Sequence, residues 1–106
     1  MLIRTLEDLP STRVSEAPGV ATKVIKEADE AELKLFDLTP GAATPYHTHA
    51  HSHEVVVLSG TGLVRDASVD REVSEGDVVS IAAHEHHSFV SGPDGLRFMC
   101  LDCLFG

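Results

Sequence analysis

The apolar stretches of this chain are short, and turn residues interrupt them at regular intervals. The run Val55–Leu58 is typical, and turn signals occur at Ser59-Gly60, Glu75-Gly76-Asp77 and Ser91–Gly95. Short apolar segments between turn signals about 8–12 residues apart are the pattern of an antiparallel sandwich or barrel. The sequence therefore predicts an all-β fold, in which only Ala28–Leu35 has the alanine and glutamate content of a helix.

The chain is long enough for one domain and too short for two. We assign residues 20–106 to a β-barrel domain and residues 1–19 to an N-terminal segment, an extra strand or turn that is also a candidate dimer contact. The predicted strands are Val20–Lys26, Glu32–Leu38, Tyr46–His49, His53–Leu58, Gly62–Arg65, Val69–Val73, Val78–Ile81, His87–Val90 and Leu96–Leu104.

Charge and composition exclude several classes of partner. Lysine and arginine number 8 against 17 acidic residues, a net charge of −9, whereas nucleic acids and anionic membranes require clustered cations. No apolar run is long enough for a transmembrane helix, and the first ten residues lack the features of a secretory signal. Two cysteines make no disulfide scaffold, so we expect a cytoplasmic protein.

Histidine is the unusual component of this sequence. All seven histidines lie between positions 47 and 87, and His47, His49, His51 and His53 occupy alternate positions. Alternate side chains of an extended chain point to the same face, so His47, His49 and His53 can converge if the chain bends near Ala50–Ser52. The direction of His51, at that bend, stays open.

The alternation of the residues that follow distinguishes His53 from its neighbour Glu54, because adjacent side chains of a strand point to opposite faces. Only one of the two can point inward, and we choose His53 because Val55 and Val57 continue its face. A second cluster, His84-Glu85-His86-His87, lies further along. Neutral imidazoles suit Fe, Mn, Ni, Zn and Cu, so the pattern predicts one divalent transition metal ion per chain.

The spacing of glycines and histidines resembles the two motifs of the cupin family. Gly41 is followed by five residues, His47-Thr-His49, three residues, His53, six residues and Gly60, and Gly76 stands eleven residues before His87. This resemblance implies a jelly-roll barrel (a double-stranded β-helix). It also implies the four-histidine metal site of some small single-domain cupins, with His47, His49, His53 and His87 as ligands.

Three departures from these motifs are visible. Ala82 and His84 stand where the second motif has proline and glycine, and Ser91 replaces an asparagine. The first motif lacks its usual carboxylate, unless Glu54 rather than His53 is the ligand. That alternative would leave five residues, not six, before Gly60.

The last segment, from Leu96 to Phe105, has apolar residues at even positions (Leu96, Phe98 and Cys100) and at odd positions (Met99, Leu101 and Cys103). A strand that is apolar on both faces is buried on both. We therefore expect a homodimer that covers the outer face, with the alternative that the N-terminal segment folds over it.

Two further residues are candidates for proton transfer. Cys100 shares parity with Phe98 and can line the pocket, although packing as a small apolar residue is the simpler role, and Cys103 points to the other face. His84 and His86 precede His87 on a loop, where solvent exposure is the simplest expectation. We take Cys100 and His86 as candidate catalytic residues.

Four neutral ligands leave open coordination positions if the metal is octahedral and none if it is tetrahedral. The inferred interior is apolar and offers no obvious carboxylate base. That pattern favours an O2-dependent, dioxygenase-like oxidoreductase acting on a small organic substrate. The alternatives are a metal-dependent isomerase or lyase for a sugar or uronate, and a non-catalytic metal or small-ligand binding module.

Overall fold

A computed structural model of the chain describes residues 1–104, and the fold is all-β as predicted. Seven strands follow a short 3-10 turn at Leu6–Asp8. They are β1 (Thr12–Arg13), β2 (Val20–Glu27), β3 (Ala31–Leu38), β4 (Ser52–Arg65), β5 (Asp70–Ser74), β6 (Val78–Ile81) and β7 (Ser88–Cys103). Within the described residues, no helix has the length and apolar character needed to cross a membrane.

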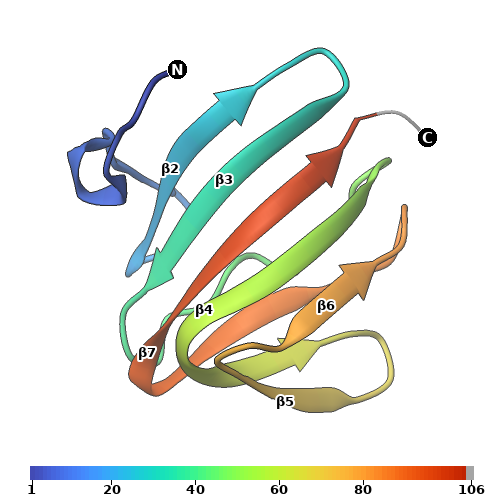
Figure 1. Ribbon diagram of the computed structural model, residues 1–106. Coiled ribbons are helices and arrows are strands. Elements are labelled where there is room, and N and C mark those ends of the chain that lie inside the picture. Colours follow the sequence, from blue (N-terminus) through green and yellow to red (C-terminus); the bar gives the residue numbers. More distant parts are fainter. Residues whose placement is uncertain (105–106) are drawn as a thin grey trace.

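The long strands β4 and β7 organise the whole sheet (Figure 1). Every pairing is antiparallel, in the order β1-β2-β3-β7-β4-β5, and β6 pairs with the first half of β4. The pairing of β4 with β7 shifts register between Gly60 and Gly62, where both strands turn back on themselves. This double bend produces the two facing layers of a jelly roll, and the candidate site lies between them.

Glycine makes the bend possible because two backbones meet there. Gly60 has φ +85°, and a Cβ atom on it would lie 2.0 Å from the carbonyl oxygen of Gly95. Gly95 itself has φ +80°. The left-handed region favours glycine, and the close approach excludes any side chain at position 60.

The strands continue through positions where we predicted turns. Ser59-Gly60 and Ser91–Gly95 do not end strands, so our separate segments 53–58 and 62–65 form β4, and 87–90 and 96–104 largely form β7. The predicted strand Tyr46–His49 is also wrong, since only an isolated bridge between His47 and His87 forms there. Ala28–Leu35 is not helical and contributes to the β2–β3 hairpin.

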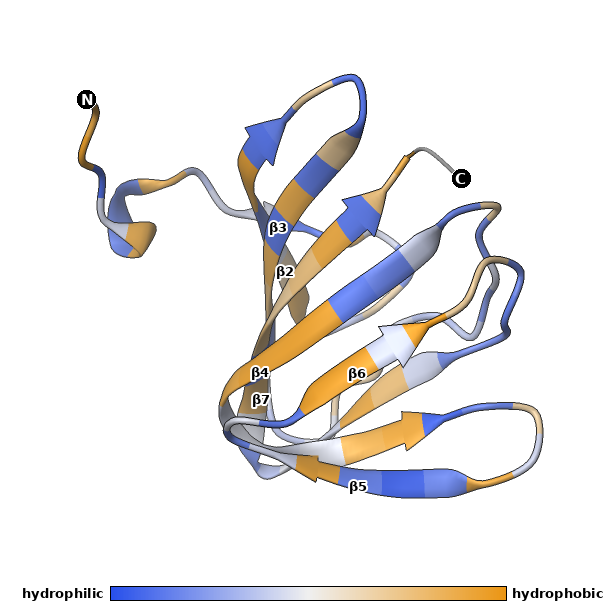
Figure 2. Ribbon diagram, turned by 45° about the vertical axis from the view of Figure 1, so that its right-hand side comes forward, coloured by the Kyte–Doolittle hydropathy of each residue, from blue (hydrophilic) through white to orange (hydrophobic). Residues whose placement is uncertain are grey.

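Side chains alternate along β4 as the parity argument predicts. Val55 and Val57 are buried in the core with Phe89, Phe98 and Leu96, and Val56 is exposed. Figure 2 shows β4 with a hydrophilic beginning (blue) and a hydrophobic middle (orange). The polar site therefore lies at the open end of the barrel, and the apolar core lies toward the bend.

The N-terminal segment pairs with the edge of the sheet and contacts its outer face near β2, and our alternative that it covers the last strand remains a prediction. β1 pairs with β2, and the ammonium group of Lys23 donates to the carbonyl oxygen of Leu6 at 2.7 Å. Leu35, which lies beside Lys23 and Met99 in the sheet, is fully buried. The Arg97 guanidinium binds Asp37 at 2.6 Å on the same face.

Three apolar side chains of the outer face remain accessible beside Glu54. Val56, Val78 and Leu101 are exposed there. The homodimer across this face remains a prediction. Phe105, which the apolar segment also includes, lies outside the described residues.

Candidate metal centre

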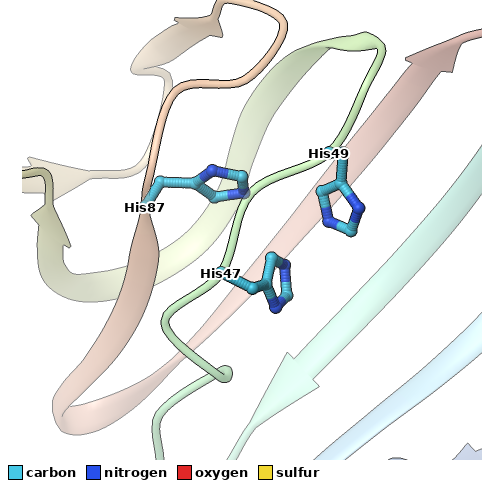
Figure 3. Close-up of side chains that lie close together, drawn as sticks. All are labelled: His47, His49 and His87. Carbon is cyan, nitrogen blue, oxygen red and sulfur yellow. The ribbon is translucent and has the colours of Figure 1, made fainter.

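Three histidines from two loops face one another at the open end of the barrel (Figure 3). His47 and His87 form a two-way backbone bridge, with N–H···O distances of 3.1 and 3.0 Å. The backbone N–H of His84 donates to the carbonyl oxygen of His49 at 2.6 Å, which ties the same segment to the second loop. The ring nitrogens of His47, His49 and His87 lie within 4.8 Å of one another, close enough for one metal ion.

His53 approaches the same place from the beginning of β4. Its ring centroid lies 4.7 Å from that of His49 and 5.4 Å from that of His87. Among residues 1–104, His53 Nε2 is the one buried side-chain nitrogen or oxygen atom without a hydrogen-bond partner. A buried polar atom without a partner carries a desolvation cost, so its presence requires an explanation. A metal ion that accepts its lone pair would supply one, and the imidazole set fits such an ion.

The other polar residues near these four histidines make different contacts. Glu54 points outward and accepts a hydrogen bond from the Ser80 hydroxyl at 2.7 Å. His51 is half-buried, with its ring 4.9 Å from that of His53. His84 is exposed, and the exposed His86 stacks on Tyr46 with 5.7 Å between centroids.

An inward carboxylate, which we expected to be absent, lies directly behind His53. Asp102 is 5% exposed, and its Oδ1 lies 2.5 Å from His53 Nδ1. The Cys100 thiol donates to the same oxygen at 3.1 Å. Asp102 lies on the same face of β7 as Phe98 and Cys100, so the alternation of side chains along the strand already indicated its inward direction. The sequence prediction missed this carboxylate because most of the surrounding residues are apolar.

A cation also faces this interior. Lys34 Nζ lies 3.4 Å from Asp102 Oδ2 and 2.9 Å from a Glu32 oxygen. Burial alone would raise the pKa of Asp102, but hydrogen bonds from His53 and Cys100 and the charge of Lys34 hold it below its ordinary value. Burial, together with the bond to Asp102, raises the pKa of the Cys100 thiol. Cys100 is therefore a thiol at neutral pH, which makes it a poor nucleophile.

A cavity of about 280 Å³ adjoins the histidines. Phe36, Phe89 and Phe98 form part of its wall. The Phe98 ring stacks on both others, with its centroid 5.2 Å from that of Phe36 and 4.5 Å from that of Phe89. The space thus has one polar end, at the imidazoles, and one aromatic end. It is large enough for a small organic molecule and matches the mixed lining of ligand sites.

Burial changes the acidity of the clustered histidines. It lowers the pKa of His47, His49 and His87, with the neighbouring imidazoles adding to the effect, and it brings the pKa of His49 to about 4. The neutral form is the one that can donate a lone pair to a metal. The fold therefore keeps these rings ready for a metal below the pH at which a free imidazole becomes charged.

The lowered pKa values predict that metal-free protein loses stability on mild acidification. Between pH about 6.5 and 4 the unfolded chain binds protons at positions 47, 49 and 87 that the folded chain does not. The free energy of unfolding therefore decreases as the pH is lowered through this range. Urea unfolding in chelator at pH 7 and pH 5 measures the difference. Asparagine at all three positions should remove most of it, and an equally pH-dependent triple variant would contradict this origin.

Comparison with known proteins places the site in context. The pattern of the cupin domain family matches residues 34–102. A 1-methylthio-D-xylulose 5-phosphate methylsulfurylase of Rhodospirillum rubrum is 31% identical over 71 residues, which are 66% of this chain and 46% of that protein. The dimethylsulfoniopropionate lyase DddW of Ruegeria pomeroyi is 32% identical over 66 residues, 62% of this chain and 43% of the lyase.

The chain spans less than half the length of these two curated relatives. A solved structure, the polyketide cyclase RemF of Streptomyces resistomycificus, superimposes with a TM-score of 0.88 at 27% identity, covering 99% of this chain and 81% of that one. The names of these three proteins describe different reactions.

Proposed function

The chain belongs to the cupin domain family, and from this premise we propose that it binds one divalent transition metal ion and acts there on a small organic substrate. The proposed ligands are His47, His49, His53 and His87. The observation that carries the proposal is the buried, unpartnered Nε2 of His53, which lies among the other imidazoles. Fe, Mn, Ni, Zn and Cu all suit such a donor set.

The reaction that we propose is an O2-dependent, dioxygenase-like oxidation. A redox-active ion such as iron or manganese would supply the electron-transfer chemistry. Phe36, Phe89 and Phe98 would hold the apolar part of the substrate beside the histidines and keep water away from it. His86, stacked on Tyr46 and exposed, would exchange protons with solvent. The Cys100 thiol, whose pKa is raised, would keep its proton and act within the cavity as the hydrogen-bond donor to Asp102.

A non-oxidative reaction is the second candidate, because the interior contains charged groups that could assist it. Asp102 and Lys34 both line the cavity. A lyase or isomerase needs positioned groups for proton transfer, and a bound ion would polarise a carbonyl. The names of the methylsulfurylase and the lyase among the relatives also favour this class. The third candidate, a non-catalytic binding module, needs the metal site alone.

Metal analysis and anaerobic loading distinguish these candidates. Protein purified without a histidine tag should contain about one transition metal ion per chain. After loading with Fe or Mn without air, addition of O2 and a panel of aromatic or alkene substrates should produce oxygen uptake and oxidised products, whereas His53→Ala should not. Turnover of a uronate or keto-sugar without O2, with no oxidation product from any substrate, would instead favour the lyase or isomerase.

A further inference from the structure

Three buried side chains form a connected group behind the candidate metal site. His53, Cys100 and Asp102 are 5%, 7% and 5% exposed. Oδ1 of Asp102 lies 2.5 Å from His53 Nδ1 and 3.1 Å from Cys100 Sγ, and Oδ2 lies 3.4 Å from Lys34 Nζ. β7 carries Cys100 and Asp102, and the pairing of His53 with Asp102 across β4 and β7 brings the imidazole to the carboxylate.

The donors around Asp102 determine which nitrogen of His53 carries the proton. An ionised carboxylate only accepts hydrogen bonds. The Cys100 thiol donates to Asp102 and the Lys34 ammonium group forms an ion pair with it, so the carboxylate is ionised. His53 Nδ1 must therefore be the protonated nitrogen, and Nε2 carries the lone pair. Nε2 is also the buried atom without a partner.

The four clustered histidines are not equivalent in this respect. His87 Nδ1 faces a neutral acceptor, the carbonyl oxygen of Glu85, at 2.9 Å. His53 alone among the four, within residues 1–104, hydrogen-bonds to a carboxylate. A carboxylate behind a ligating imidazole fixes the ring and raises its basicity. It would also place one negative charge behind four otherwise neutral ligands.

We propose that Asp102 is a positioning residue that holds the proton of His53 on Nδ1 and so makes Nε2 the strongest donor of the metal site. The proposal rests on the proposed function for its metal, but the tautomer is a property of the metal-free chain. Asp102 acts through His53 and does not itself bind the ion.

The first test is a nitrogen-15 NMR measurement of His53 in metal-free protein. The wild-type ring should have its proton on Nδ1. Asp102→Leu, which removes the acceptor at similar size, should produce a mixture of the two tautomers. Asp102→Asn retains an acceptor oxygen and should preserve the wild-type signature. A wild-type His53 with its proton on Nε2 would overturn the proposal, whether or not the protein binds metal.

The second test measures Zn2+ affinity by competition with a chelator. Asp102→Leu should weaken binding about 10–100-fold, the usual effect of losing such an outer partner, and Asp102→Asn should fall between this variant and wild type. Asp37→Leu is the matched control, because Asp37 is a carboxylate paired with Arg97 on the outer face.

Folding is checked by circular dichroism before titration. A folded Asp102→Leu protein that binds Zn2+ as tightly as wild type would contradict the proposal. If wild-type protein binds no metal at all, the proposed function fails, while the NMR result still decides the role of Asp102 toward His53.

Discussion

Alanine at His47, His49, His53 or His87 is expected to remove most of the bound metal from the purified protein. Each change deletes one imidazole from a cluster whose centroids lie 4.3–5.7 Å apart in the pairs that the structure brings together. Losing a direct ligand should weaken binding by more than the roughly 10–100-fold effect of losing an outer partner. Metal content by elemental analysis and Zn2+ titration measure the effect.

The matched control for these variants is His84→Asn. His84 belongs to the same loop as His87, but its side chain is exposed. Its backbone φ is +66°, a conformation that asparagine tolerates better than alanine does. Asparagine also keeps the backbone N–H that binds the carbonyl oxygen of His49. His84→Asn should therefore retain wild-type metal content. Full occupancy in His87→Ala would refute the proposed ligand set.

The largest loss of stability is expected for Gly60→Ala. The new Cβ atom would lie 2.0 Å from the carbonyl oxygen of Gly95 and 2.8 Å from its carbon, at a backbone φ of +85°. Backbone atoms on both sides leave little room for adjustment, so we expect a loss of more than about 4 kcal/mol in the free energy of unfolding. Urea unfolding followed by circular dichroism measures it.

Gly76→Ala separates the steric clash from the backbone conformation. Gly76 has φ +89°, but no atom lies within 4 Å of an added Cβ. Its variant should lose only the cost of a left-handed alanine, about 1–2 kcal/mol. Equal losses in the two variants would mean that β4 and β7 do not meet closely at the bend.

Local patterns in the sequence carried much of the fold. Turn signals and short apolar runs indicated strands, and side-chain alternation placed His53, Val55 and Val57 on the inner face of β4, where the structure has them. These patterns depend on neighbours along the chain, so the sequence alone contains them. The glycine and histidine spacing likewise indicated the family that the comparison establishes.

The errors share a different cause. Ser59-Gly60 and Ser91–Gly95 were predicted to end strands, but β4 and β7 bend there together, because each supplies the other with backbone partners on either side of the turn. Tyr46–His49 was predicted to be a strand, but apart from the isolated bridge between His47 and His87 these residues form no strand pairing. Whether a turn signal ends a strand or bends it depends on a partner strand, which sequence proximity does not reveal.

The same distinction between local pattern and tertiary pairing applies to the candidate metal centre. The sequence by itself determined which imidazoles are available, and alternation along β4 turned His53 inward with Val55 and Val57. The motif spacing had indicated His87 as a member of the group. Only the tertiary structure decided that His47 and His49 lie beside His87, that His53 Nε2 is buried without a partner, and that Asp102 lies behind it. The physical reason is distance along the chain. His53 and Asp102 are 49 residues apart, and only the pairing of β4 with β7 brings a carboxylate to an imidazole.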